Sequence, residues 1–333
     1  MSLGRIGQAL TVREIFSLIQ DDLRRVEDEI AVESVASVDA ITSIARYLQA
    51  SGGKRLRPAL LLLSSRLIGD GGKNAISLAA VVEIIHSATL VHDDVIDAAE
   101  TRRGRLSTNA QFGNHTSVLA GDWLYMQAFQ IALRQRNFRI LDILISLTQM
   151  MVEGELIQLE RIGKIDVSEA DYMDLVDRKT AALFSACSRL GALTSSADPE
   201  TELRMGDYAW NLGMAFQLVD DVLDFTARES VLGKPVGNDL REGKVTLPLI
   251  YALESATPAE REGIEGILRD NNYDRMPFRQ VKQMIEKYNG FERAKTRANA
   301  FTEKARQIIG TFPESAYQRA LYSVTELVTE RDH

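Results

Sequence analysis

The chain has 333 residues, 45% hydrophobic and 26% charged, so it is long enough to bury a large core and has an ordinary globular composition. Its net charge of −8 argues against a general nucleic-acid-binding protein, which normally carries a basic surface. The single cysteine, Cys187, excludes an intramolecular disulfide, and no uninterrupted apolar stretch is long enough to span a bilayer. Because no signal pattern is recognisable either, we expect a cytoplasmic protein without stable membrane insertion.

Helical periodicity dominates the chain. No proline occurs between Pro58 and Pro199, and apolar residues in that span recur every three or four positions instead of alternating. We therefore expect an all-α fold. The expected long helices cover 12–33, 37–50, 58–69, 74–98, 114–135, 138–162, 168–193, 201–226 and 245–256. Since only short breaks separate them, we expect one domain over residues 1–333.

The first informative segment is SGGKRLRP, residues 51–58, where Pro58 fits the first position of the next helix. Lys54, Arg55 and Arg57 crowd this helix N-terminus, which is the wrong sign for the helix dipole. The same end offers free N–H groups to an anion, so a bound phosphate would resolve the conflict. Taken alone, the segment is better explained as a solvated basic turn.

The helix expected over 74–98 ends in an acidic cluster. Asp93, Asp94 and Asp97 stand at positions i, i+1 and i+4, so Asp93 and Asp97 share a face with Asp94 beside them. Acids at a helix C-terminus face the negative end of the dipole and each other, which is unfavourable unless a cation is bound. Hard oxygen ligands suit magnesium. His86, two turns before Asp93, is expected to line the same cavity, although a lone helical histidine is usually structural.

Two short polar segments follow. In ETRRGRLST, Gly104 is the expected turn residue, and Arg102 and Arg103 stand next to the aspartates. Such arginines are commonly plain ion pairs, but beside metal-loaded acids they also match a diphosphate, which accepts bidentate guanidinium bonds. Further on, Lys179 and Thr180 are polar residues that enter an apolar helix, and alone they indicate little.

A second acidic cluster repeats the spacing of the first. Asp220, Asp221 and Asp224 again stand at i, i+1 and i+4 near a helix end, with Gln217 one turn before Asp221. One such cluster is a weak signal because exposed helices often carry acids. Two clusters, each embedded in an apolar helix, are hard to ascribe to solvated faces.

The loop after the second cluster, GKPVGNDLREGKVTLP, places Lys234 and Lys244 among glycines. This composition suits a lid over an anion, although a plain flexible loop has the same composition. The chain thus offers two carboxylate clusters for magnesium, several cations for phosphates and a long apolar interior. These features suit an enzyme that ionises a diphosphate ester and shields the carbocation from water.

These motifs resemble those of the polyprenyl synthetase family, in particular its trans-isoprenyl diphosphate synthases. The match runs from about Gly52 to Lys244 and includes GGKRLRP, HDDVID followed by RRG, KT, FQLVDDVLDF and GKPVGNDLREGK. The resemblance implies an antiparallel helix bundle around a central cavity, usually in a homodimer. It also implies about three magnesium ions that bridge an allylic diphosphate to the two acidic motifs.

By the same resemblance, isopentenyl diphosphate attacks the allylic cation and the released diphosphate takes the proton. The residues implied to bind isopentenyl diphosphate are Lys54, Arg57, His86 and Arg103. Those implied to hold the allylic diphosphate are Arg102, Lys179, Gln217, Lys234 and Lys244. Lys179 and Thr180 are also expected near the developing cation, and the metal ligands and catalytic acids are expected to be Asp93, Asp94, Asp97, Asp220, Asp221 and Asp224.

Product length is expected to depend on the residues four and five positions before the first aspartate. In this family bulky side chains there give short products, whereas here the positions hold Thr89 and Ala88. The product path should therefore continue towards Ile85 and Val82. Candidates for its far wall on the next helix are Trp123, Tyr125 and Met126. The segment HSATLVHDD also resembles synthases that make quinone side chains, so we predict a long-chain product, octaprenyl diphosphate.

Two alternatives remain open. A geranylgeranyl or farnesyl diphosphate synthase would use the same chemistry and release a shorter product. A protein of another class, a non-catalytic subunit of a hetero-oligomeric synthase, would typically lack one acidic motif, whereas both motifs are intact here.

Overall fold

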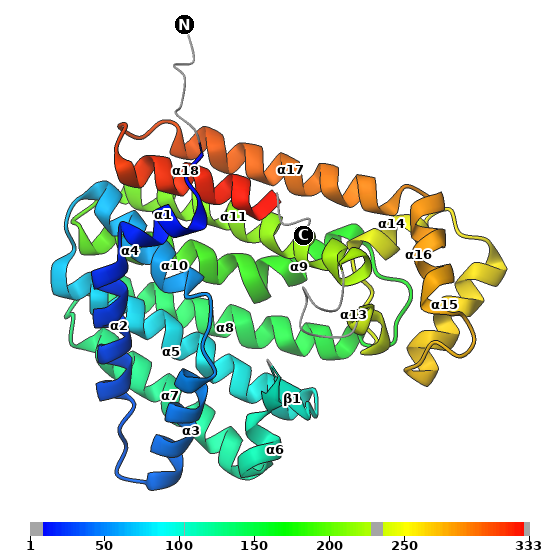
Figure 1. Ribbon diagram of the computed structural model, residues 1–333, viewed down its shortest axis with the longest axis horizontal. Coiled ribbons are helices and arrows are strands. Elements are labelled where there is room, and N and C mark those ends of the chain that lie inside the picture. The colour runs from blue at the N-terminus through cyan, green and yellow to red at the C-terminus, as the bar shows by residue number, and fades with distance from the viewer. Residues whose placement is uncertain (1–8, 103, 228–235, 330–333) are drawn as a thin grey trace, which may run out of the picture. The chain divides into compact units, whose positions relative to one another are not determined.

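The computed structural model describes residues 9–102, 104–227 and 236–329. Within these ranges the all-α prediction is confirmed, because helices form nearly all the regular structure (Figure 1). The elements are α1 (Val12–Ser17), α2 (Gln20–Glu33), α3 (Asp39–Ala50), α4 (Leu56–Ile68), α5 (Gly72–Ile96), β1 (Thr101–Arg102), β2 (Arg105–Leu106), α6 (Thr108–Phe112), α7 (Asn114–Leu133), α8 (Phe138–Arg161), α9 (Glu169–Val176), η1 (Asp177–Ala181), α10 (Ala182–Thr194), α11 (Pro199–Thr226), α13 (Asn238–Arg241), α14 (Leu247–Leu253), α15 (Pro258–Asp270), α16 (Phe278–Lys287), α17 (Gly290–Ile309) and α18 (Ala316–Thr329).

Internal contacts divide the chain into two units. Unit 1 comprises residues 1–146, 186–206 and 312–323, and unit 2 comprises residues 147–185, 207–311 and 324–333. Four of the five boundaries fall inside the helices α8, α10, α11 and α18, and the fifth lies between α17 and α18. Each unit is described by itself, and a single domain over the whole chain stays a prediction.

The helix α5 forms the core of unit 1, where it packs against α2, α4 and α7 (Figure 1). Every side chain from Ala75 to Ile85 is buried, as expected for a helix that is apolar on all sides. Among the described residues α5 is the one helix long and apolar enough to cross a membrane, but 72% of its most apolar window is buried within the chain. That burial is typical of the core helix of a folded domain.

Several element boundaries in unit 1 differ from the expected ones. The helix expected over 12–33 is two helices, and α4 begins at Leu56, which puts Pro58 at the third helical position. Proline is tolerated there because the first four N–H groups of a helix have no intrahelical acceptor. The hairpin of β1 and β2 was not expected, since two residues per strand are too few to show alternation. Gly104 lies in its turn with φ of +74°, as predicted.

In unit 2, the helix expected over 168–193 is interrupted by a π-helical turn. The helix α9 ends at Val176, η1 follows, and α10 begins at Ala182. Such turns are rare and occur frequently at functional sites. The neighbouring helix α8 comes very close here, because a Cβ atom added at Gly154 would lie 2.9 Å from the Cβ atom of Arg178. The turn carries Lys179 and Thr180.

The C-terminal part of unit 2 is organised around α14, which packs against α16 and α17 (Figure 1). All seven residues of α14 are buried. The helix α17 begins close to α14, since a Cβ atom at Gly290 would lie 2.3 Å from the carbonyl oxygen of Pro248. A glycine is therefore needed at this contact.

Candidate active site

A pocket in unit 1 brings together three segments that the sequence singled out. Its lining includes Gly52 of the basic segment, His86 of α5 and Arg102 of β1. In the basic segment Lys54 is exposed and Arg57 is half-buried. The cations in its lining are Arg55 and Arg102, which stand there with the acids Glu83 and Asp94, whereas Lys54 and Arg57 are not among the lining residues.

Asp94 differs from the other two acids of the first cluster. Its side chain is buried, and one carboxylate oxygen accepts a hydrogen bond from Nε of Arg102. The other oxygen accepts hydrogen bonds from the backbone N–H and the hydroxyl of Thr108, at 3.3 and 3.2 Å. Asp94 thus ties β1 and the first residue of α6 to α5. It is also the acid of this cluster that lines the pocket with His86, where Asp93 was expected.

That the three carboxylates of the first cluster converge on a metal ion stays a prediction. Among the described residues, no group of three Asp, Glu, His or Cys side chains is already arranged to hold a metal ion. In this cluster Asp94 is engaged by Arg102 and Thr108. Asp93 is half-buried and Asp97, which caps α5, is exposed. These two offer hard oxygen donors at a hydrated position, the kind of site that magnesium accepts because it retains several waters.

The second acidic cluster belongs to a hydrogen-bonded chain in unit 2. The hydroxyl of Tyr172 donates to Oδ2 of the buried Asp221 at 2.6 Å, and Nε2 of Gln217 donates to Oδ1 at 2.8 Å. The hydroxyl of Thr180 in η1 donates to Oε1 of Gln217 at 2.9 Å. Residues singled out in two separate motifs, Thr180 in one and Gln217 and Asp221 in the other, are thereby joined. Tyr172 was missed because a lone tyrosine fifty positions away from the cluster carries no signal in the sequence.

Burial is the largest cause that raises the pKa of the Asp221 carboxyl well above its usual range, and the negative charge of Asp239 raises it further. Asp239 also approaches Asp224, whose Oδ2 accepts a hydrogen bond from the Asp239 backbone N–H at 3.3 Å. Asp239 lies in the segment GKPVGNDLREGK, of which only Lys234 and Lys244 were predicted to act. A cation bound beside these acids would offset the cost of their negative charges, so the donor set fits magnesium.

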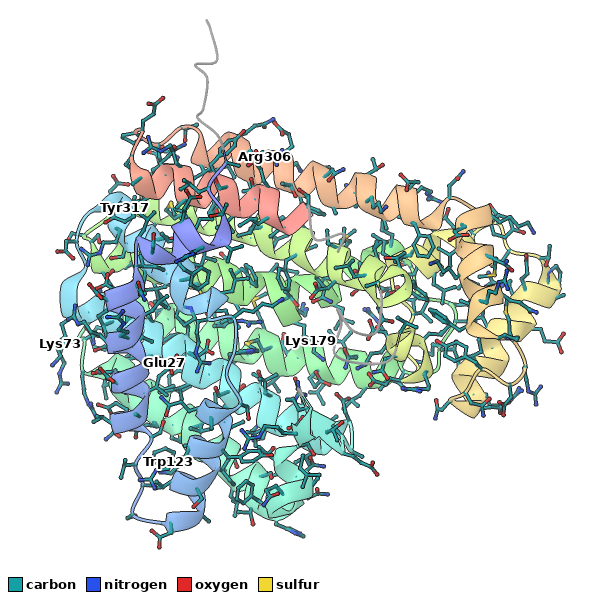
Figure 2. The ribbon with its side chains drawn as sticks, in the orientation of Figure 1. Glu27, Lys73, Trp123, Lys179, Arg306 and Tyr317 are labelled. Carbon is teal, nitrogen blue, oxygen red and sulfur yellow. The ribbon has the colours of Figure 1, made fainter. Side chains whose placement is uncertain are left out.

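Lys179, labelled in Figure 2, contacts two residues of α8. Its Nζ atom forms an ion pair with Glu155 at 2.6 Å and donates a hydrogen bond to Oε1 of Gln158 at 3.0 Å. Neither partner was singled out in the sequence, although both follow Gly154 within one helical turn. They hold the lysine next to the π-helical turn.

Of the three remaining cationic candidates, the structure describes only Lys244. Lys244 forms an ion pair with Glu242 at 2.8 Å. Arg103 and Lys234 lie outside the described residues, so their roles stay predictions.

The two residues expected to control product length lie on α5. Ala88 is fully buried and Thr89 is half-buried, with its hydroxyl donating to the carbonyl oxygen of His86 at 2.7 Å. Ile85 and Val82, further along the expected path, are fully buried. The side chains at 88 and 89 are small, as the prediction requires, but the path itself stays a prediction.

An all-α fold with two aspartate clusters near helix ends, the first beside Arg102, fits a class of enzyme that binds diphosphate esters through metal ions. The sequence pattern of the family described as polyprenyl synthetase matches residues 38–286. The chain therefore belongs to the polyprenyl synthetase family, and it is a trans-prenyltransferase.

Individual relatives agree with this assignment. Octaprenyl diphosphate synthase of Haemophilus influenzae is 37% identical, over 97% of this chain and 98% of its own length. Geranylgeranyl diphosphate synthase of Sulfolobus acidocaldarius is 39% identical, over 73% of this chain and 76% of its own. A crystal structure of polyprenyl synthase from Caulobacter crescentus CB15, complexed with calcium and isoprenyl diphosphate, matches with a TM-score of 0.91 and 34% identity. That match covers 98% of this chain and all of the other.

Proposed function

We propose that the chain condenses isopentenyl diphosphate with an allylic diphosphate in repeated head-to-tail steps to make a long-chain all-trans polyprenyl diphosphate, octaprenyl diphosphate. The observation that carries this proposal is the similarity over 97% of the chain, at 37% identity, to an octaprenyl diphosphate synthase. The small, buried Ala88 supports it, because no bulky side chain blocks α5 at that position.

We propose magnesium as the metal. Asp93 and Asp97 are the proposed ligands in unit 1, and Asp220 is the proposed ligand in unit 2, since Asp94 is engaged by a cationic and Asp221 by a neutral protein group. Bound magnesium would supply electrostatic stabilisation of the departing diphosphate. The calcium and isoprenyl diphosphate in the Caulobacter relative support a divalent cation as a ligand of this class of protein.

The chain's own residues would then divide the work between the two substrates. Lys54, Arg57 and His86 would bind the diphosphate of isopentenyl diphosphate, and Arg102 that of the allylic substrate. Thr180 presents a hydroxyl held by Gln217, a fixed dipole that would stabilise the developing cation without reorganisation. Apolar walls would keep water from that cation.

We also propose a cytoplasmic homodimer that associates through α7 and α8. Phe138, Ile145, Val152 and Leu159 repeat every seven residues along α8, and all four are exposed. Apolar residues at this spacing form a stripe suited to pairing with another helix. Substituting Ile145→Glu and Val152→Glu together should give a monomer by light scattering. A variant that remains dimeric would contradict this interface.

Product analysis tests the proposed reaction. The purified chain, supplied with magnesium, farnesyl diphosphate and radiolabelled isopentenyl diphosphate, should release octaprenyl diphosphate, identified by chromatography after dephosphorylation. A product that stops at geranylgeranyl diphosphate would establish the shorter-chain alternative. No turnover by the chain alone, with turnover restored by a partner chain, would establish the non-catalytic subunit.

A further inference from the structure

Arg55 has an unusual backbone conformation for its residue type. It precedes the first residue of α4 with φ of +48° and ψ of +31°, in the left-handed region. A side chain other than that of glycine is strained there, so such a residue persists only where its surroundings determine the conformation. Arg55 lies between Lys54 and Arg57 in the basic segment, so whatever fixes its backbone also fixes theirs.

Two carboxylates determine the position of the Arg55 side chain. Its guanidinium group binds Glu27 of α2 through Nε and through Nη2, the latter at 3.1 Å, and Glu83 of α5 through Nη1 at 2.7 Å. Glu27 is labelled in Figure 2, and Gln49 of α3 donates to its carboxylate at 3.3 Å. The side chain of Arg55 is 18% exposed and that of Glu83 is 9% exposed. The contact with Glu83 is therefore shielded from solvent, while Glu27, which is 35% exposed, binds the same guanidinium group from a more open position.

This network distinguishes Arg55 from its basic neighbours. Because three of its guanidinium nitrogens already bind carboxylates, Arg55 is not an anion-binding group as its place in the basic cluster suggested. Glu83 lies one turn before His86 on α5, and Gly52, Arg55, Glu83 and His86 line the same pocket. The arginine thus joins the backbone of the basic segment to the helix that carries His86.

Arg66 makes a similar contact and shows what a purely structural arginine–carboxylate pair looks like in this chain. Arg66, at the other end of α4, binds Asp22 of α2 through Nε at 3.1 Å and Nη2 at 2.7 Å. The helices α2 and α4 are therefore joined by a second arginine–carboxylate contact. Only the contact of Arg55 lies in the pocket and on the segment with left-handed backbone.

We propose that Arg55 is a positioning residue for the isopentenyl diphosphate site. Its guanidinium group, held between Glu27 and Glu83, fixes residues 51–57 so that Lys54 and Arg57 present their charges to one diphosphate beside His86. Arg55 itself does not bind the substrate. The inference rests on the proposed function, because the identity of the diphosphate comes from it.

Steady-state kinetics of three variants test the proposal. Arg55→Asn removes the ion pairs but keeps a residue that tolerates the left-handed region. Arg55→Lys keeps a charge that cannot bridge two carboxylates, and Glu83→Gln removes one partner with little change in volume. We expect KM for isopentenyl diphosphate to rise about tenfold in Arg55→Asn and less in the other two, because small displacements of positioning groups weaken binding strongly. KM for the allylic diphosphate and kcat should stay within about twofold of the wild type.

Arg66→Lys is the matched control and should leave both KM values unchanged. A fall in Tm for Arg55→Asn with no change in KM for isopentenyl diphosphate would overturn the proposal and leave Arg55 as a structural contact. Equal increases in both KM values, or the same increase in the Arg66→Lys control, would also overturn it. If Arg55→Asn does not fold, Arg55→Lys and Glu83→Gln decide by the same criterion.

Measurements on the wild-type enzyme distinguish a failure of the proposed function from a failure of the positioning role of Arg55. If the wild type shows no prenyltransferase turnover, the proposed reaction is wrong, and binding of inorganic diphosphate is then measured by calorimetry. Weaker binding in Arg55→Asn than in Arg66→Lys would still support the positioning role, and equal binding would overturn it.

Discussion

The hydroxyl of Tyr172 on α9 donates a 2.6 Å hydrogen bond to the carboxylate of Asp221 on α11, and both side chains are buried. The bond begins a chain that continues through Gln217 to Thr180 in the π-helical turn. A residue outside every recognised motif therefore sets the orientation of three residues inside them.

Tyr172→Phe should lower kcat. Removing the hydroxyl leaves one oxygen of a buried carboxylate without its donor, and hydrogen bonds to charged groups contribute about 1.5–3 kcal/mol. We expect kcat to fall about tenfold with little change in either KM, because Asp221 would no longer hold Gln217 and Thr180 in place. Tyr288→Phe is the control, since Tyr288 donates a comparable bond to Glu260, which belongs to neither acidic cluster. Equal kcat in the two variants would contradict this role for Tyr172.

Asp94 and Asp97 should respond differently to removal of their charge. Asp94→Asn breaks the contacts to Arg102 and Thr108 and should cost about 2 kcal/mol of unfolding free energy. Asp97→Asn, at the exposed end of α5, should change stability by less than about 0.5 kcal/mol. It should instead raise the magnesium concentration for half-maximal activity about tenfold, as expected when a ligand is lost. Urea unfolding and magnesium titration measure the two effects. If Asp94→Asn instead raises the magnesium concentration for half-maximal activity more than Asp97→Asn does, and leaves stability unchanged, Asp94 is a magnesium ligand.

The acidic motifs could be found from the sequence because spacing along one helix is a local property. The orientation of the second aspartate in each motif, Asp94 and Asp221, could not be predicted from the sequence. Asp94 is turned by Thr108 and Asp221 by Tyr172, residues that come close only after distant segments pack. The π-helical turn was missed for another reason: apolar periodicity continues through it, and the extra residue per turn leaves no mark in composition.

Arg55 shows the same limit on a smaller scale. From its residue type and its position before a helix, Arg55 was grouped with Lys54 and Arg57 as a cation that could attract an anion. The carboxylates that occupy it come from α2 and α5, and the left-handed backbone that they enforce is atypical of arginine. The family resemblance selected Lys54 and Arg57 for the ligand and left Arg55 out, but the physical reason, two carboxylates on α2 and α5, is visible only in the fold.

Glu202 should make stability depend on pH in the acid range. Burial raises the pKa of its carboxyl, but hydrogen bonds from Arg139 and Arg189 outweigh burial and hold the pKa below its usual value of 4.5. A lowered folded-state pKa contributes stability that is present above pH 4.5 and is lost as pH falls through the folded-state value. Glu202→Gln should therefore cost about 2 kcal/mol at pH 7, less than a fully buried pair because Arg139 is half exposed.

Urea unfolding at pH 7 and pH 4 measures this dependence. The difference between the wild type and Glu202→Gln should shrink at the lower pH, where the wild type loses the contribution. The exposed neighbour Glu200 supplies the control, because Glu200→Gln should give a small difference that does not change with pH. A constant difference for Glu202→Gln would refute the assignment.

Ala88→Phe should shorten the product. Ala88 is fully buried on α5, so a phenyl ring there must occupy whatever space the growing chain would use. We expect products shorter than those of the wild type, because the ring would close the proposed path, with initial turnover of the allylic primer retained. Ala88→Ser, which adds one oxygen atom, should leave the product at octaprenyl length. Chromatography of the dephosphorylated products decides, with Tm measured on both variants because overpacking a core costs about 1–3 kcal/mol. A folded, active Ala88→Phe enzyme that still makes the wild-type product would show that the chain grows along a different wall.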